Sequence, residues 1–133
     1  MKNCPTVLVL IVLIAVFGCA SDKKKNDLDV TLRFYERSIK WGSYRDAQSL
    51  SDTPVAQERL DQYKDIKVIS YEVLRQEVTG DFDQLSQVVE IKFYHQDQGT
   101  IKTVRDKQVW TFDDDRDVWV LQTGLPDFIS AAR

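Results

Sequence analysis

The residue whose position most clearly suggests a chemical reaction is Cys19, which follows a long apolar segment. The sequence from Val7 to Phe17 is apolar without a break, with Lys2 ahead of it and Gly18 directly before the cysteine. A helix of this segment would span roughly 17 Å, well short of a hydrocarbon core of about 30 Å. A positively charged start before a short apolar core is typical of a secretory signal peptide.

The end of this segment, Val16-Phe17-Gly18-Cys19, resembles the lipobox of bacterial lipoproteins, in which an aliphatic, a variable and a small residue precede cysteine. The resemblance implies that the Cys19 thiol is diacylglycerylated, the Gly18–Cys19 bond is cut, and the new amino group is acylated. Two or three acyl chains hold a protein stably, since each buried methylene contributes about 0.8 kcal/mol. Residues 1–18 are then a lipoprotein signal peptide. A plain signal peptide with an incidental cysteine and an uncleaved anchor helix are the alternatives.

By the same resemblance, the residue after Cys19 indicates the destination of the protein. Ala20 stands where an aspartate favours retention in the inner membrane of Gram-negative bacteria. We therefore expect the cell envelope, at the periplasmic face of the outer membrane, with the inner membrane as the less favoured location. The membrane is then a partner through the lipid on Cys19.

Charge and cysteine content limit the other partners. Removing residues 1–18 from the 133-residue chain takes away one of 18 basic residues and none of 21 acidic ones, which leaves a net charge of about −4. An acidic domain without basic clusters argues against nucleic acid as a partner. The remaining chain is long enough for one domain, and its single cysteine allows no internal disulfide. The basic run Lys23-Lys24-Lys25 could contact anionic head groups, but a solvated linker is the favoured interpretation.

Carboxylates on the expected strands are the only candidates for acid–base chemistry. They are Glu72, Glu90 and Asp106, with Tyr71 and Tyr94 nearby in sequence. A pocket enzyme would place such a carboxylate inside an apolar cavity. Glu90 and Asp106 lie among basic residues, however, which is typical of charge pairing across strands on a solvated face. We expect no catalytic residue.

No metal or cofactor site can be assembled from the sequence. His95 is the only histidine, and an exposed position at a strand end is its favoured interpretation. The acidic run Asp113-Asp114-Asp115-Arg116-Asp117 lacks the glycine and terminal glutamate of a calcium loop, so a solvated hairpin turn is the favoured interpretation. No dinucleotide fingerprint is present.

Aromatic residues could line a ligand pocket between the helices and the strands, although aromatics at these spacings more often form the core. The candidate lining residues are Tyr35, Trp41, Tyr71, Tyr94, Trp110 and Trp119.

Three helices are expected in the first half of the chain. Residues 19–27 are polar and without period, which predicts a lipidated N-terminus and a short tether. Apolar residues from Leu28 to Ile39 recur with helical spacing, and Trp41-Gly42 ends that helix. A second short helix follows Ser43. Thr53-Pro54 predicts the start of a third, as an N-cap with proline at the first helical position.

Four strands are expected in the second half, where the apolar period changes from 3.6 to 2. Short turns rich in Gly and Asp separate them, which predicts antiparallel hairpins in a meander. Strands of about a dozen residues must twist or bend in a small sheet. The fold class is therefore α+β, with N-terminal helices packed on a curved four-stranded antiparallel sheet. The expected strands are Ile66–Thr79, Leu85–Gln96, Ile101–Phe112 and Val118–Thr123.

This order of elements resembles the NTF2-like superfamily of cone-shaped α+β domains. The resemblance rests on Trp41-Gly42-Ser43-Tyr44 with Ala47, on Lys107-Gln108-Val109-Trp110 and on Trp119, and it covers residues 28–128. A cystatin-like arrangement of helix on sheet is the nearest alternative. Because the superfamily hosts isomerases, dehydratases, adaptors and secretion subunits, the resemblance implies no activity.

The favoured hypothesis is a non-enzymatic, lipid-anchored envelope protein that binds a protein partner or a small apolar ligand through its helix–sheet domain. It needs no cofactor. The alternatives are a small pocket enzyme of isomerase or dehydratase type and a structural subunit of an envelope assembly.

Overall fold

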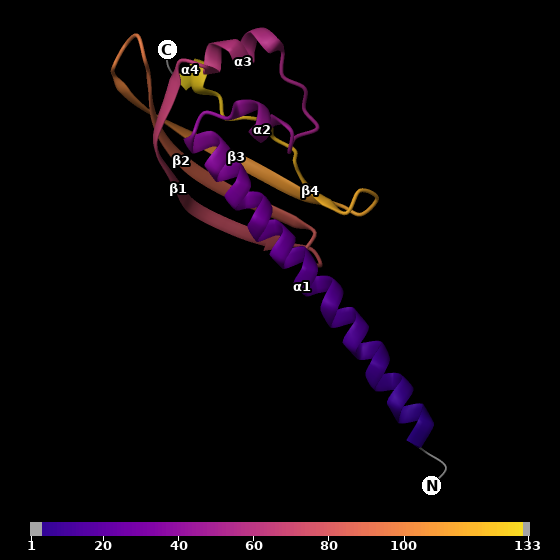
Figure 1. The fold of residues 1–133 in the computed structure, drawn as a ribbon. Helices are drawn as coiled ribbons and strands as arrows, with labels where there is room; N and C mark the ends of the chain where they lie inside the picture. The colour runs from indigo at the N-terminus through magenta and orange to yellow at the C-terminus, as the bar shows by residue number, and fades with distance from the viewer. Residues whose placement is uncertain (1–3, 132–133) are drawn as a thin grey trace.

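The computed structural model describes the backbone of residues 4–131 and the side chains of residues 22–131. Helices occupy the first half of the chain and a four-stranded antiparallel meander the second, which confirms the predicted α+β class (Figure 1). The elements are α1 (Cys4–Lys40), α2 (Tyr44–Gln48), α3 (Gln57–Tyr63), β1 (Ile66–Thr79), β2 (Gln84–His95), β3 (Ile101–Asp113), β4 (Val118–Leu121) and α4 (Phe128–Ala131).

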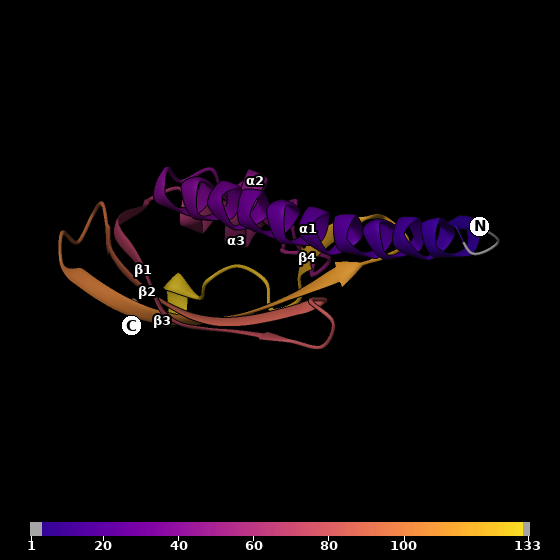
Figure 2. The same cartoon turned by 90° about the horizontal axis from the view of Figure 1, so that it is seen from below.

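The helix α1 lies across the concave face of the sheet and extends beyond it (Figure 2). Leu28, Tyr35 and Ile39 face the sheet with helical spacing and are buried. The helix ends where the sequence predicted. Gly42 has a φ of 73°, and the backbone N–H of Ser43 donates to the carbonyl of Ser38 at 2.8 Å. Such a left-handed C-cap is the usual way to satisfy the last carbonyls of a helix.

Two expectations about the helices are wrong. Residues 20–27 are helical and continuous with the rest of α1, where a patternless tether was expected. The third helix begins at Gln57 with Ala56 as N-cap, and not at Thr53-Pro54. The Thr53 hydroxyl donates to the carbonyl of Gln122 at 3.3 Å, so this side chain ties the loop to the end of β4 and caps no helix.

The sheet has the order β1-β2-β3-β4, and its strands match the predicted ones within two residues. Two β-bulges interrupt β1, between Val68 and Ser70 and between Val73 and Arg75. A bulge bends the strand and increases its twist, which accounts for the curvature that the long strands required.

Aromatic rings fill the space between the helices and the sheet. Tyr35 of α1 meets Trp110 of β3 edge to face, with ring centroids 5.2 Å apart. Phe128 of α4 contacts the rings of Tyr44, Tyr63 and Phe93. These contacts join the chain's last helix to α2, α3 and β2, so one core holds the whole domain together.

Candidate functional site

The six aromatic residues that were candidates for a pocket lie in different surroundings. Tyr35, Trp110 and Trp119 are 0%, 0% and 2% exposed and belong to the core. Tyr71 and Tyr94 are half-buried on β1 and β2. Trp41 is 80% exposed just beyond the end of α1. The structure thus brings Tyr35 and Trp110 into contact, and it places Trp119 against the rings of Phe82 and Phe112.

The strand carboxylates divide between the two faces of the sheet. Glu90 stands opposite Arg105 in the register and its carboxylate lies 3.5 Å from the guanidinium, as the charge-pairing interpretation predicted. Glu72 is exposed. The same interpretation is wrong for Asp106, which is 8% exposed. Asp106 stands opposite the buried Val89, so its side chain points toward the core and not toward solvent.

Three glutamines form a row beside Asp106. Gln76, Gln87 and Gln108 stand directly opposite one another on β1, β2 and β3. Each side-chain amide donates to the next: Gln76 to Gln87 at 3.0 Å and Gln87 to Gln108 at 2.7 Å. Gln108 then donates to the Asp106 carboxylate at 2.8 Å and to the Tyr71 hydroxyl at 3.1 Å. We call Gln76, Gln87, Gln108, Asp106 and Tyr71 the polar row.

The indole of Trp110 fixes the donor-to-acceptor direction of the hydrogen bonds along the polar row. Its indole Nε1–H donates to Oε1 of Gln108 at 3.2 Å. Because an indole can only donate, this contact turns the Gln108 oxygen toward Trp110 and its NH₂ toward Asp106. Gln87 must then donate to that same oxygen. All amide dipoles therefore point their positive ends toward the carboxylate, an arrangement in which the bonds reinforce one another.

Burial dominates the electrostatics of Asp106. It raises the pKa of the carboxyl to about 6, and the hydrogen bond from Gln108 offsets part of this effect by favouring the charged form. The Tyr35 hydroxyl is buried and has no hydrogen-bond partner among the described residues. Burial, followed by the charge of Asp106, holds the pKa of Tyr35 well above its usual range. A buried carboxyl that titrates near neutral pH beside a tyrosine hydroxyl can donate or accept a proton.

Sequence reasoning missed the glutamines of the polar row. Glutamine has no charge and no fixed role, so its presence on a strand gives little signal. The alternation of buried and exposed residues along β2 and β3 could have placed Gln87 and Gln108 inside. The same alternation could not have assigned Gln76 to the concave face, because the bulge at Leu74 changes the face of the sheet to which the following residues of β1 point.

The lysine run interpreted as a solvated linker contacts the turns of the sheet. Lys23 pairs with Asp117, and Lys24 with Asp114 at 3.7 Å. The ammonium of Lys24 lies 4.6 Å from the centre of the Phe112 ring, and that of Lys25 lies 5.4 Å from Phe82. The Trp119 indole also donates to the Lys24 carbonyl at 3.1 Å. We call these contacts of Lys23, Lys24 and Lys25 the lysine clamp.

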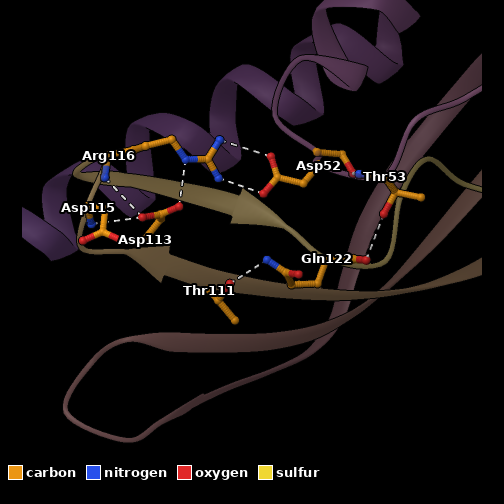
Figure 3. Close-up of polar contacts among 8 residues, drawn as sticks. Asp52, Thr53, Thr111, Asp113, Asp115, Arg116 and Gln122 are labelled. Carbon is orange, nitrogen blue, oxygen red and sulfur yellow. Dashed lines mark hydrogen bonds and ion pairs between the residues drawn. The ribbon is translucent and has the colours of Figure 1, made fainter.

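The acidic turn between β3 and β4 is held by internal contacts (Figure 3). One carboxylate oxygen of Asp113 accepts from the backbone N–H groups of Asp115 and Arg116, at 3.0 and 3.1 Å. The Arg116 guanidinium donates to the other oxygen at 2.7 Å and forms two hydrogen bonds with Asp52, at 3.1 and 2.7 Å. This turn therefore ties β4 to the loop after α2.

His95 is the last residue of β2 and lies between two carboxylates. Its Nε2 is 3.9 Å from Asp65, and its Nδ1 is 3.8 Å from Asp97. The three side chains bring ligand atoms within 4.8 Å of one another, a separation that one metal ion could bridge. The two carboxylates approach different ring nitrogens, however, and the backbone N–H of Asp97 donates to Nδ1 at 3.3 Å. The two carboxylates thus lie nearest to different nitrogens of the ring.

A surface pocket of about 410 Å³ lies between α3 and the C-terminal tail. Arg59 and Asp127 line it and pair with each other at 2.9 Å, beside the half-buried Leu125. The pocket is thus open to a small molecule with both polar and apolar parts.

The geometry defines the class of the protein: a small α+β domain with helices on the concave face of an open antiparallel sheet. Within the part of the chain that the structure describes, no helix is long and apolar enough to cross a membrane. A comparison with protein families, with curated proteins and with solved structures finds no match for this chain.

Proposed function

We propose that the chain is a lipid-anchored protein of the bacterial cell envelope, held at the periplasmic face of the outer membrane. The observation that carries this proposal is the sequence Val16-Phe17-Gly18-Cys19 after an apolar core too short to span a bilayer. The Cys19 side chain lies outside the described part of the structure.

Metabolic labelling with a palmitate analogue tests the anchor. We expect label in the wild-type chain and none in Cys19→Ala, which is also expected to leave the membrane fraction or to keep its signal peptide. Cys4→Ala is the matched control, because the proposed signal peptide carries Cys4 away, and it is expected to label fully. Equal labelling of wild type and Cys19→Ala would contradict the proposal.

The domain of residues 28–128, of the NTF2-like kind by its resemblance, is proposed to bind a protein partner or a small apolar ligand without catalysis. Two exposed apolar side chains of α1, and a third directly after its end, support a protein partner. Val30, Phe34 and Trp41 are 59%, 42% and 80% exposed, at spacings of four and seven residues. Exposed apolar residues that share a helix face are typical of helix-mediated recognition.

Site-specific photo-crosslinking in intact envelopes tests this binding face. A photoreactive residue at position 34 or 41 is expected to give one adduct of defined size. The same residue at position 103, which is exposed on β3 and away from α1, is the control and is expected to give none. Identical adduct patterns at all three positions would count against a binding face on α1.

A small pocket enzyme of isomerase or dehydratase type is the second candidate function. The observation that favours it is Asp106, an inward-pointing buried carboxyl with a pKa raised to about 6, whose charge also raises the pKa of the unpartnered Tyr35 hydroxyl. A fragment screen followed by NMR tests it through the Trp110 indole N–H, which contacts the polar row. Fragments that shift this resonance in the wild type but not in Asp106→Asn are expected. A screen whose hits leave the Trp110 resonance unchanged would exclude the candidate.

A further inference from the structure

The outer edge of β1 is the longest open edge of the sheet. β1 has 14 residues and pairs only with β2. Four of its apolar side chains are between 42% and 50% exposed: Ile69, Val73, Leu74 and Val78. An edge strand presents free backbone donors and acceptors, and it pairs readily with another strand unless the sequence opposes this.

The sequence of β1 is nearly its own complement when it is read in the opposite direction. Ile69 and Leu74 are the extra residues of the two bulges, so about a centre at Val73 the facing residues would be Val68 with Val78, Ser70 with Glu77, Tyr71 with Gln76 and Glu72 with Arg75. Apolar residues would thus face apolar ones. The Glu72–Arg75 pair would form twice, once on each side of the two-fold axis. Facing side chains of opposite charge stabilise an antiparallel pair, and facing like charges destabilise it.

The bulge at Leu74 allows this pairing. Glu72 stands opposite Glu90 and Arg75 opposite Val88, and these two partners are two residues apart on the regular strand β2. Glu72 and Arg75 therefore share the convex face of the sheet, although three positions separate them. In an unbroken strand they would point to opposite faces and could not pair with a second copy in this way.

Glu72 forms no ion pair with any residue of its own chain that the structure describes. Its neighbour across β2 is Glu90, which pairs with Arg105 at 3.5 Å. Among the residues that the structure describes, neither Glu72 nor Arg75 forms an ion pair. A second copy would bring an arginine beside Glu72 and so relieve the repulsion between Glu72 and Glu90.

We propose that two copies of this chain pair through their β1 edges, antiparallel, about a two-fold axis at Val73. The two four-stranded sheets become one continuous sheet with two Glu72–Arg75 ion pairs. Charged residues and bulges often protect an edge from pairing. Here the charges are complementary in a single antiparallel register, so they select that register and oppose the others.

The axis is perpendicular to the sheet, so it reverses the direction of α1 in the second copy. The two N-termini then leave the dimer at opposite ends, which two straight helices fixed in one flat bilayer cannot do. The pairing is therefore proposed for chains whose N-termini are not held in one flat bilayer, and it excludes the lipid anchor for both copies of one dimer. Its test uses chains in separate detergent micelles, where neither N-terminus constrains the other.

Sedimentation of the full-length chain in a density-matched detergent tests the pairing by charge reversal. The wild type is expected to be dimeric. Glu72→Arg and Arg75→Glu each place like charges opposite one another twice, so each is expected to weaken association about tenfold or more. The double variant, Glu72→Arg with Arg75→Glu, restores opposite charges and is expected to return to within about threefold of the wild type.

The control variant is Glu58→Arg, a reversal at an exposed position of α3, which is expected to leave association unchanged. Circular dichroism checks that each variant is folded, and either single variant suffices for the comparison with the double. A monomeric wild type would overturn the proposal. So would single and double variants that associate as strongly as the wild type.

Discussion

Asp106 lies on the core-facing side of β3 with its carboxyl buried, and pH decides whether that group is charged. Burial raises its pKa to about 6, against roughly 3.9 for aspartate in an unfolded chain. The folded state therefore binds this proton more tightly than the unfolded state does. The stability that the protonated group contributes is fully present below about pH 4, and it is lost as the pH rises through about 6.

Asp106→Asn tests this effect, because asparagine keeps the shape of the side chain and stays neutral. At pH 7.5 the variant is expected to be more stable than the wild type by on the order of 2–3 kcal/mol, whereas at pH 4 the two are expected to be similar. Urea unfolding at both pH values measures the difference.

The control for Asp106→Asn is Asp46→Asn, at an exposed position of α2. It is expected to show no comparable change between the two pH values. A difference between Asp106→Asn and the wild type that is the same at pH 4 and pH 7.5 would show that ionisation is not its cause.

At the scale of elements, the lysine clamp holds residues 22–27 of α1. Residues 22–27 lie beyond the buried stripe of the helix and have little helical signal of their own. The hydrogen bond from Trp119 to the Lys24 carbonyl and the ion pairs with the β3–β4 turn hold this segment against the sheet. Most helical stability in proteins comes from such packing and not from local propensity.

Trp119→Phe removes the indole donor while it keeps an aromatic ring between Phe82 and Phe112. Loss of one hydrogen bond, worth about 1 kcal/mol, is expected to speed amide exchange in residues 22–27 about fivefold. Hydrogen exchange followed by mass spectrometry measures this.

Trp41→Phe is the matched control for Trp119→Phe, because Trp41 follows the same helix but is 80% exposed. It is expected to leave exchange in residues 22–27 unchanged. Residues 32–39 pack on the core and are expected to exchange at the wild-type rate in both variants. Uniform acceleration along α1 in Trp119→Phe would indicate global destabilisation and contradict a local role.

At the scale of the whole molecule, α1 sets the distance between the proposed anchor and each end of the domain. Trp41 follows Cys19 by 22 positions, or about 33 Å along a straight helix. The β3–β4 turn contacts Lys23 and Lys24, so it lies near the anchored end. Figure 1 shows this turn on the side of the domain from which the N-terminal part of α1 extends.

Energy transfer to an acceptor dye in the bilayer tests this orientation. The mature chain keeps no free thiol once Cys19 carries lipid, so a donor dye can be placed at one introduced cysteine. Asp115→Cys in the β3–β4 turn is expected to transfer strongly, and Trp41→Cys weakly. Both positions are exposed, which makes them a matched pair. Equal transfer from the two positions would exclude a straight α1 leaving the membrane.

The sequence by itself determined the elements and their order, because the signals involved are local. The apolar period, the glycine after α1 and the turns rich in Gly and Asp each act over a few residues, and they predicted β1 at the bounds it has. The tertiary structure decided which side chains meet. Gln76 reaches Gln87 only because of the bulge at Leu74, and a single extra residue in a strand changes every face beyond it.

The same distinction between local signals and tertiary contacts applies to the lysine run and to Asp106. The composition of Lys23-Lys24-Lys25 indicated a solvated linker, since a run of charges has no local reason to be helical. The β3–β4 turn, about ninety positions later, supplies the carboxylates and the ring that hold it. Asp106 likewise lies among basic residues in the sequence but faces the core, because the register places it opposite Val89. Contacts between residues far apart in the chain depend on packing, which no local pattern records.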